Sequence, residues 1–301
     1  MKIAVQGLGR MGMQIARKLA EDDHYVIAHN RSPEKIDVAV GYGAHGAKTK
    51  QDVLDAFGGD QVVLWIMLPA DVVDQHLEEW NQLLPKGSII IDGGNSDFRL
   101  TKQRNQVVTG AGHSWFDAGV SGGVWGYQNG FSMMVGGDNE AALETLEPAL
   151  KTLAAPEGAY HHFGPSGSGH FVKMTHNAIE YGMMESLAEG YRVLKDGPYQ
   201  GLDLAAAGEV WQHHSVITSW LNQLSRDALR ENPELEGIEG YVAESGEARW
   251  TLETAKDLGL PLPSIQAAFD VRIASQKGEV NFATKLLAAM RHKFGGHELN
   301  K

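Results

Sequence analysis

The sequence feature that most limits the possible folds is a glycine-rich turn placed directly after the first apolar run. We expect Lys2–Val5 to form a strand and Met11–Ala20 to form a helix, with the turn between them. The spacing Gly-x-Gly-x-x-Gly is typical of dinucleotide-binding domains, where the glycines permit a tight turn, close approach of a pyrophosphate, and close packing of helix on strand. The free N–H groups at the helix N-terminus bind phosphate. The sequence therefore predicts that a dinucleotide contacts Gly7, Leu8, Gly9, Arg10, Met11 and Gly12.

The rest of the first half repeats this alternation of strand and helix. Apolar runs of strand length, without polar alternation, are separated by stretches with helical periodicity, as in a parallel sheet covered by helices on both faces. The expected strands are Tyr25–His29, Val62–Leu68, Ser88–Asp92, Trp115–Val120 and Phe131–Val135. The expected helices are Pro33–Val40, Asp71–Leu84, Asp97–Thr109 and Asn139–Leu150.

The second half has a different character. From Gly169 onward, Ala, Leu, Met, Glu and Gln recur at helical spacing and no strand is evident. The natural joint is the turn-rich segment 164–169, which reads Gly-Pro-Ser-Gly-Ser-Gly. We therefore expect an α/β Rossmann-type domain over residues 1–163, with a mostly parallel sheet, followed by an all-α substrate and dimerisation domain over residues 164–301 that ends in a C-terminal tail.

Composition narrows the functional classes. The 26 Lys and Arg residues against 38 Asp and Glu residues give a net charge of −12, which disfavours non-specific nucleic-acid binding. An anionic ligand must then be bound by a local basic pocket. The chain has no cysteine, which excludes disulfides, thiolate catalysis and cysteine-ligated metals. Without a membrane-length apolar run or a recognisable signal peptide, we expect a cytoplasmic protein.

The turn after the second expected strand bears on cofactor choice. It reads His-Asn-Arg-Ser-Pro over residues 29–33. NAD-selective sites usually place Asp or Glu here to accept the ribose hydroxyls. Asn30 followed by Arg31 would instead accommodate a 2′-phosphate, because a guanidinium binds it and a carboxylate repels it. The turn therefore favours NADP over NAD, with a solvated turn residue as the alternative role for Arg31.

The highest density of polar side chains lies in the segment His170–Gly182. If this segment is helical, one face carries Lys173, His176, Asn177, Glu180 and Tyr181. We expect Val172, Ile179 and Met183 to pack on the opposite face. Five polar residues are unfavourable to bury without partners. The pattern alone leaves open whether they form a solvated stripe or line a cleft.

With two further motifs, this segment makes the chain resemble the short-form 6-phosphogluconate dehydrogenases of the β-hydroxyacid dehydrogenase superfamily. The motifs are Asp-Gly-Gly-Asn-Ser at residues 92–96 and Gly-Val-Ser-Gly-Gly at residues 119–123. The match continues at Arg249-Trp250-Thr251, where the family has Lys-Trp-Thr, at Arg272, and in the tail from Arg291 to His297. It runs in order along the whole chain, which lacks the extra helical portion of the common long form.

The resemblance implies oxidative decarboxylation of 6-phosphogluconate to ribulose 5-phosphate and CO2 with reduction of NADP, in the pentose phosphate pathway. Lys173 would be the base that deprotonates the 3-hydroxyl, and Glu180 the acid that protonates C1 of the enediol left after CO2 is lost, with no metal required. His176 and Asn177 complete the catalytic set. The resemblance assigns the remaining substrate contacts to Asn95, Ser121, Gly122 and Gly123, and the 6-phosphate contacts to Tyr181, Arg249, Thr251, Arg272, Arg291 and His297.

The resemblance extends the cofactor contacts and suggests an assembly. The added cofactor residues are Asn30, Arg31, Ser32, Leu68 and Asn95. A homodimer is implied, in which the tail residues are shared between the two active sites. The three arginines assigned to the 6-phosphate would supply the local basic pocket that an acidic chain needs.

Other functions remain open at this point. A related β-hydroxyacid dehydrogenase acting on a small unphosphorylated 3-hydroxy acid could share Lys173, Asn177 and Ser121. A non-catalytic NADP-binding sensor would need neither Lys173 nor Glu180. Gly-x-Ser-x-Gly at residues 119–123 also occurs in hydrolases, but there a helix must follow the serine. The segment 122–126 predicts no helix start, which argues against a hydrolase.

Overall fold

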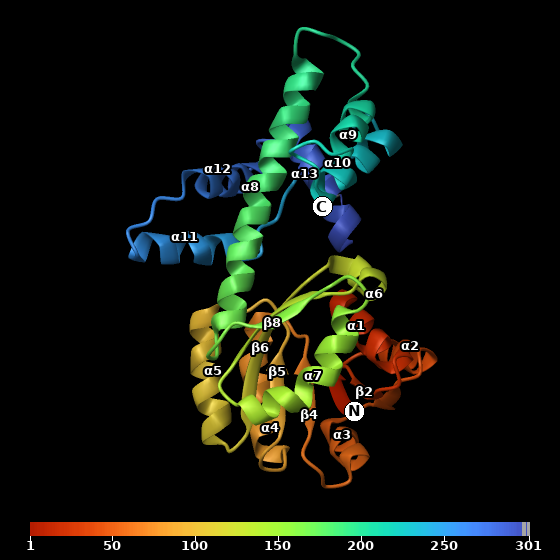
Figure 1. Ribbon diagram of the computed structural model, residues 1–301, viewed down its shortest axis with the longest axis vertical. Helices are drawn as coiled ribbons and strands as arrows, with labels where there is room; N and C mark the ends of the chain where they lie inside the picture. Colours follow the sequence, from red (N-terminus) through yellow and green to blue (C-terminus); the bar gives the residue numbers. More distant parts are fainter. Residues whose placement is uncertain (297–298, 300–301) are drawn as a thin grey trace. The chain divides into compact units, whose positions relative to one another are not determined.

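The computed structural model describes residues 1–296 and residue 299, and the chain divides into two compact units, residues 1–173 and 174–301 (Figure 1). We refer to these as unit 1 and unit 2. None of the described helices is both long enough and apolar enough to cross a membrane.

Unit 1 is built on a sheet that has eight strands among the described residues, in the order β3-β2-β1-β4-β5-β6-β7-β8. The strands from β1 to β6 are parallel, β7 is antiparallel to β6, and β8 is parallel to β7. The strands are β1 (Lys2–Gln6), β2 (Tyr25–His29), β3 (His45–Ala47), β4 (Val63–Ile66), β5 (Ile89–Asp92), β6 (Ser114–Ser121), β7 (Ser132–Gly137) and β8 (Tyr160–His162).

Helices cover both faces of this sheet, and each face has its own apolar core (Figure 1). Along β1, Ile3 and Val5 belong to one core with α1, α2 and α7, whereas Ala4 belongs to the other core with α3, α4 and α5. The continuous apolar runs arise because both faces of each strand are buried. The helices are α1 (Arg10–Glu21), α2 (Pro33–Gly41), α3 (Lys50–Phe57), α4 (Ala70–Leu83), α5 (Phe98–Gly110), α6 (Gly126–Asn129) and α7 (Glu140–Ala154).

Three short elements escaped the sequence prediction. The strands β3 and β8 have three residues each, too few to show an apolar run, and α3 begins at a capping box between Thr49 and Asp52. The prediction that no helix starts after Ser121 was wrong. A 3-10 turn (Gly123–Trp125) and the one-turn helix α6 follow directly, and single turns leave no periodic pattern. They lead into the antiparallel strand β7, so the long helix of a hydrolase is not formed.

The described part of unit 2 contains helices joined by loops and no strand, as the sequence predicted. Its core combines residues of α8, α9, α10 and α13, including Met184, Tyr191, Leu224 and Leu287. The helices are α8 (Ser168–Asp196), which begins in unit 1, α9 (Leu204–Gln212), α10 (Trp220–Glu231), α11 (Glu247–Asp257), α12 (Pro263–Ser275) and α13 (Phe282–Gly295). The predicted fold class, a Rossmann-type α/β domain followed by an all-α domain, is confirmed.

Candidate active site

The glycine-rich turn has the shape that a pyrophosphate requires. Gly7 has φ of +96°, and a Cβ on Gly12 would lie 1.9 Å from the carbonyl oxygen of Gly7, so neither position tolerates a side chain. A Cβ on Gly9, by contrast, would meet no atom within 4 Å. Helix α1 begins after Gly9 without a side-chain cap. The uncapped N-terminus therefore faces open space over Gly9, which suits a bound phosphate.

Asn30 braces this turn from the end of β2. Its Oδ1 accepts a hydrogen bond from the backbone N–H of Leu8 at 3.0 Å, and its Nδ2 donates to the carbonyl oxygen of Ser32 at 3.3 Å. The amide is therefore engaged within the protein, whereas the neighbouring Arg31 is exposed. Of these two residues, Arg31 is the one whose side chain is accessible to a cofactor phosphate.

A buried polar group under the turn was not predicted from the sequence. Gln6, the last residue of β1, is 2 % exposed, and its Oε1 accepts a hydrogen bond from Trp80 Nε1 at 2.7 Å. Its Nε2 must then donate to Nδ1 of His76, 3.0 Å away. Burial, the largest cause, lowers the pKa of His76, so the ring stays neutral and can accept this bond. The only sequence signal was a polar residue at the end of an apolar strand.

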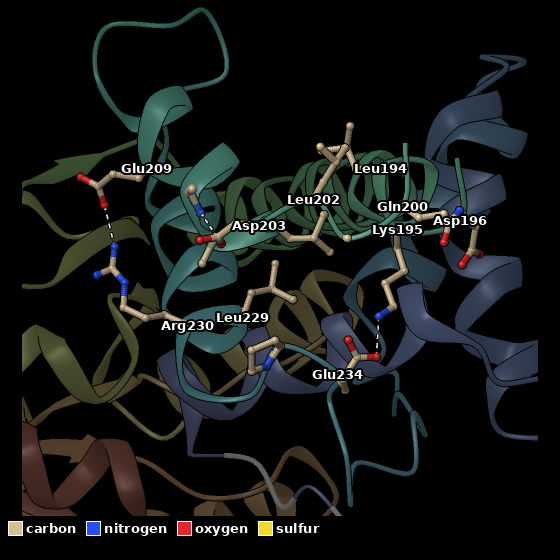
Figure 2. A pocket seen from close by; sticks show the side chains of 15 residues that line it. Leu194, Lys195, Asp196, Gln200, Leu202, Asp203, Glu209, Leu229, Arg230 and Glu234 are labelled. Atoms are coloured by element: carbon tan, nitrogen blue, oxygen red, sulfur yellow. Dashed lines mark hydrogen bonds and ion pairs between the residues drawn. The ribbon is translucent and has the colours of Figure 1, made fainter. Parts of the chain in front are cut away.

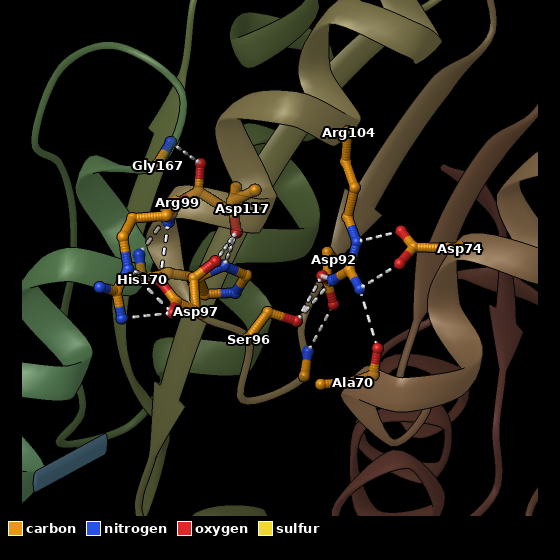
Figure 3. Close-up of polar contacts among 12 residues, drawn as sticks. Ala70, Asp74, Asp92, Ser96, Asp97, Arg99, Arg104, Asp117, Gly167 and His170 are labelled. Carbon is orange, nitrogen blue, oxygen red and sulfur yellow. Dashed lines mark hydrogen bonds and ion pairs between the residues drawn. The ribbon is translucent and has the colours of Figure 1, made fainter. Parts of the chain in front are cut away.

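Arg104 ties together the loops that follow β4 and β5 (Figure 3). It is 3 % exposed, and its guanidinium donates to Ser96 Oγ at 2.9 Å and to the carbonyl oxygen of Ala70 at 2.8 Å. Asp92 is fully buried and accepts hydrogen bonds from the Gly94 N–H and from Ser96 Oγ. This network fixes the loop that carries the exposed residue Asn95, and it joins that loop to the segment after Leu68. Sequence reasoning missed Arg104.

Strand β6 positions Lys173 through Asp117 and Gly119, which lie on the same face of the strand. Asp117 is fully buried and accepts hydrogen bonds from the N–H groups of Gly167 and His170 at 2.7 and 2.8 Å, so it caps α8 (Figure 3). Two residues along, a Cβ on Gly119 would lie 2.2 Å from the Cβ of Lys173. Ser121 follows on the same face, since alternate residues of a strand share a face. Lys173 is 6 % exposed.

Within α8, the buried face is not the one we predicted. Ile179 and Met183 are 51 % and 45 % exposed, whereas Tyr181 is 3 % exposed. The sequence pattern gives the helical period but not which side is covered by the other helices. The buried stripe consists of Met174, Ala178, Tyr181, Met184, Ala188 and Tyr191. The solvated-stripe alternative therefore fails for Lys173 and Tyr181, while His176, Asn177 and Glu180 are partly buried.

Asn177 is hydrogen-bonded on both sides of its amide. Its Nδ2 donates to Oε1 of Glu247 at 2.8 Å, and its Oδ1 lies 2.9 Å from Nδ1 of His176. Glu247 is 1 % exposed and lies in the first turn of α11. Sequence reasoning did not single out Glu247, because no spacing rule links it to α8.

Arg272 is a buried cation stacked on Tyr181. Its side chain is fully enclosed, its Cζ lies 3.2 Å from the centroid of the Tyr181 ring, and Nη1 is 3.5 Å from the carbonyl oxygen of Ala243. Among the described residues, no carboxylate lies within 4 Å of this guanidinium. Burial, with a smaller effect of Arg291, lowers the pKa of Arg272 to about 10. Glu180 and Glu185 act on Arg272 electrostatically without forming an ion pair with it. A buried cation that is not paired with a carboxylate is unfavourable, so this arrangement suits an incoming anion.

The other residues assigned to the phosphate differ in how they are placed. Arg291, on α13, is 8 % exposed and acts electrostatically on Arg272. Arg249 is exposed and forms an ion pair with Glu244. The hydroxyl of Thr251 lies 2.8 Å from the Glu247 carbonyl oxygen and 3.2 Å from that of Met174. Tyr181 and Arg272 are thus brought into contact, and His297 lies outside the described residues.

Unit 2 also contains a cavity that neither Arg272 nor Tyr181 lines. It has a volume of about 940 Å³ and lies among α9, α10 and the end of α8 (Figure 2). Its cations are neutralised internally, since Lys195 pairs with Glu234 and Arg230 pairs with Glu209. None of the predicted site residues lines it. We therefore do not assign the substrate to this cavity.

Glu185 should make stability depend on pH. It is 7 % exposed, and burial, with Glu189 adding in the same direction, raises its pKa from 4.5 to about 7. Its stabilising contribution is therefore complete below about pH 4.5 and is lost as the pH rises through 7. Glu185→Gln should raise the free energy of unfolding by about 1–3 kcal/mol near pH 8 and leave it unchanged in acid. Thermal unfolding across this range measures the effect, with Glu144→Gln, which replaces an exposed carboxyl of α7, as the control. A gain in stability at low pH would contradict the prediction.

Comparison with known proteins identifies the family. Residues 2–164 match the family model described as the NAD binding domain of 6-phosphogluconate dehydrogenase, and residues 169–301 match that of its C-terminal domain. YqeC of Bacillus subtilis, whose own assignment as a 6-phosphogluconate dehydrogenase is provisional, is 38 % identical over 100 % of both chains. The NAD(+)-dependent, decarboxylating 6-phosphogluconate dehydrogenase of Haloferax volcanii is 35 % identical over 99 % of this chain and 98 % of its own.

Solved structures agree with this assignment. The 6-phosphogluconate dehydrogenase of Plasmodium falciparum superposes with a TM-score of 0.83 and 25 % identity, over 93 % of this chain and 63 % of that longer chain. The 3-hydroxyisobutyrate dehydrogenase of Salmonella typhimurium shares the fold, with a TM-score of 0.76 and 21 % identity over 95 % of this chain and 99 % of its own. The family predicted from the motifs is therefore confirmed: this chain belongs to the 6-phosphogluconate dehydrogenase family.

Proposed function

We propose that the protein catalyses the oxidative decarboxylation of 6-phosphogluconate to ribulose 5-phosphate and CO2 with reduction of NADP. The observation that carries the proposal is Arg272, a buried guanidinium stacked on Tyr181 with no carboxylate within 4 Å among the described residues. A substrate phosphate would supply the missing counterion. The buried Arg291 would add a second positive charge, and Arg–phosphate pairs are strong and often bidentate.

In this proposal Lys173 removes the proton from the substrate 3-hydroxyl. Bound NADP supplies the hydride acceptor for C3. A lysine acts as a base only when its neutral form is populated near the working pH, and the buried position of Lys173 favours that form. Gly119 permits this position, because only a hydrogen there leaves room for the Lys173 side chain.

Loss of CO2 follows without a metal in this proposal. The new 3-keto group lies β to the carboxylate, so it accepts the electron pair of the breaking C–C bond and an enediol forms. Protonated Lys173 hydrogen-bonds the carbonyl oxygen, and Glu180 protonates C1 of the enediol, which was C2 of 6-phosphogluconate. The proton taken from the 3-hydroxyl thus balances the one delivered to this carbon. Asn95, Ser121, His176 and Asn177 would hold the carboxylate and hydroxyl groups.

We infer that NADP is the preferred cofactor because Arg31 is accessible beside the glycine-rich turn. Related proteins differ here, since the Haloferax enzyme is named NAD(+)-dependent and the Plasmodium structure contains NADP+. Arg31→Asp should lower the NADP-to-NAD ratio of kcat/KM by about 10- to 100-fold, the effect of losing charge-assisted hydrogen bonds. Steady-state rates with both cofactors measure it. Lys35→Asp, an equal charge change at an exposed position of α2, is the control, and an unchanged ratio in Arg31→Asp would remove Arg31 as the discriminating residue.

Gly119 provides a second test of the placement of Lys173. Gly119→Ala puts a methyl group where the Lys173 Cβ now lies, so the lysine must shift. We expect kcat to fall by at least about 100-fold, because small misplacements of a catalytic group have effects of this size. The control is Gly182→Ala, which lies in the same helix as Lys173. No atom lies within 4 Å of the new Cβ, so this substitution should leave kcat unchanged. Equal rates in the two variants would refute the role given to Gly119.

We also propose that the protein forms a homodimer. The family resemblance suggests a homodimer in which the tail, including His297, completes the neighbouring active site. Sedimentation of the full chain gives its oligomeric state. Removal of residues 297–301 should then lower activity toward the phosphorylated substrate without changing the dimer.

The alternative function is oxidation of a small unphosphorylated 3-hydroxy acid. It is favoured by the fold shared with 3-hydroxyisobutyrate dehydrogenase. Formation of NAD(P)H at 340 nm with 6-phosphogluconate, gluconate and 3-hydroxyisobutyrate separates the two functions. A kcat/KM for 6-phosphogluconate far above those for the other two acids supports the proposal, a preference for an unphosphorylated acid supports the alternative, and cofactor binding without any turnover indicates the sensor.

A further inference from the structure

Glu247 is a buried carboxylate that takes no part in the proposed reaction steps. It is 1 % exposed, and its Oε1 accepts a hydrogen bond from Asn177 Nδ2 at 2.8 Å. Its Oε2 is buried and has no hydrogen-bond partner among the described residues. A buried carboxylate with an unused acceptor oxygen lowers stability. Packing therefore does not explain why a carboxylate is buried at position 247. Its hydrogen bond to Asn177 offers a better explanation.

The start of α11 places this carboxylate at a helix N-terminus. Glu247 is the first residue of the helix, and the N-cap residue Gly246 provides no side-chain cap. The N-terminus of a helix stabilises a negative charge. Gly246 is required for this arrangement, because it has φ of +103° and a Cβ there would lie 2.5 Å from the Trp250 ring. No cation lies within 4 Å of Glu247 among the described residues.

The carboxylate determines which way the Asn177 amide points. The Oε1 atom of Glu247 accepts the hydrogen bond of Asn177 Nδ2, so the NH2 group of Asn177 faces Glu247. The amide oxygen then faces the opposite way, toward Nδ1 of His176 at 2.9 Å. Because this oxygen can only accept, Nδ1 must carry a proton. In the neutral imidazole, the other nitrogen, Nε2, is then an acceptor.

We propose that Glu247 is a positioning residue that fixes the Asn177 amide and, through it, the Nδ1–H tautomer of His176. In this tautomer Nε2 is the acceptor atom of the His176 ring, and Asn177 has a second N–H that can donate. A polyhydroxy acid presents both O–H donors and oxygen acceptors, so a fixed acceptor and a fixed donor select its orientation. The meaning of this arrangement for catalysis depends on the proposed function, whereas the tautomer itself does not.

The tautomer is tested directly by 15N NMR of the full-length protein labelled with 15N-histidine. The His176 signals are assigned by their loss in His176→Gln. We expect the wild-type protein to show Nδ1–H and an unprotonated Nε2. Glu247→Met, which removes the acceptor at similar size, should give a mixture of tautomers, and Glu247→Gln, which keeps one acceptor oxygen, should restore the wild-type pattern in part. An Nε2–H tautomer in the wild type, or an unchanged tautomer in Glu247→Met, would overturn the inference.

Kinetics then separate positioning from a structural role. We expect Glu247→Met to lower kcat/KM for 6-phosphogluconate by about 10- to 100-fold, with an unfolding temperature equal to or above that of the wild type. The control is Asn222→Ala, which removes a fully buried amide bonded to Tyr191 and Gly208. This control should lower Tm and leave kcat/KM of the folded enzyme unchanged.

The outcomes remain distinguishable if the proposed function is wrong. A wild-type protein that turns over none of the test substrates refutes the proposed function, and the NMR result still decides the role of Glu247. A loss of kcat/KM in Glu247→Met that merely follows a lower Tm, with the tautomer unchanged, refutes the positioning role.

Discussion

Replacing Lys173 with methionine is expected to lower kcat by about 1,000-fold or more while the dissociation constant for NADP stays within about twofold. A general base contributes factors of this order, and no other described residue has been assigned the 3-hydroxyl proton. Methionine preserves the length of the buried side chain next to Gly119, so the fold should be retained. Steady-state kinetics and calorimetric titration with NADP measure the two quantities.

The control for this substitution is Lys151→Met, which removes an exposed lysine that pairs with Glu147 on α7. It should have wild-type kinetics. A rate for Lys173→Met within about tenfold of the wild type would remove Lys173 as the base. A proportional loss of NADP binding would indicate instead that Lys173 supports the cofactor site.

Arg272→Met is expected to raise KM for 6-phosphogluconate by about 100-fold with a smaller change in kcat. The substitution removes the charge that is proposed to bind the 6-phosphate, and charge-assisted hydrogen bonds have effects of this size. Methionine can still pack on the Tyr181 ring. Because the guanidinium has no carboxylate within 4 Å among the described residues, we expect Tm to stay the same or to rise.

Two comparisons make the Arg272 result specific. Activity toward gluconate, measured at high concentration, should change little, since gluconate lacks the phosphate. Arg226→Met, which removes an arginine paired with Glu209 and Asp227, should leave KM unchanged. An equal rise of KM for phosphorylated and unphosphorylated substrates would contradict the assignment of the phosphate to Arg272.

Much of the fold could be predicted because both faces of the central strands are buried. Strands such as Ile89–Asp92 then read as continuous apolar runs, and the intervening helices have a clear period. The order of the described strands also follows the usual pattern, in which the glycine-rich turn lies at the end of a central strand. The three-residue strands β3 and β8 lacked such a signal, because backbone pairing with a neighbour defines them rather than their own composition.

The candidate site was predictable only in its motif residues. The segment around Lys173 was recognised by its pattern, but the exposed Ile179 and Met183 show that periodicity leaves the orientation of a helix open. Asp117, Arg104 and Glu247 hold the motif residues in place through contacts between distant segments. None of the three belongs to a motif of the sequence, and only the fold reveals their partners.

The most direct test of the account measures CO2 and NADPH together. With 6-phosphogluconate labelled with 13C at C1, the account predicts one labelled CO2 for each NADPH formed, and ribulose 5-phosphate as the remaining product. NADPH formation without labelled CO2 would show a simple dehydrogenase and contradict the roles of the 3-keto group and Glu180. No NADPH from 6-phosphogluconate would contradict the proposed substrate itself.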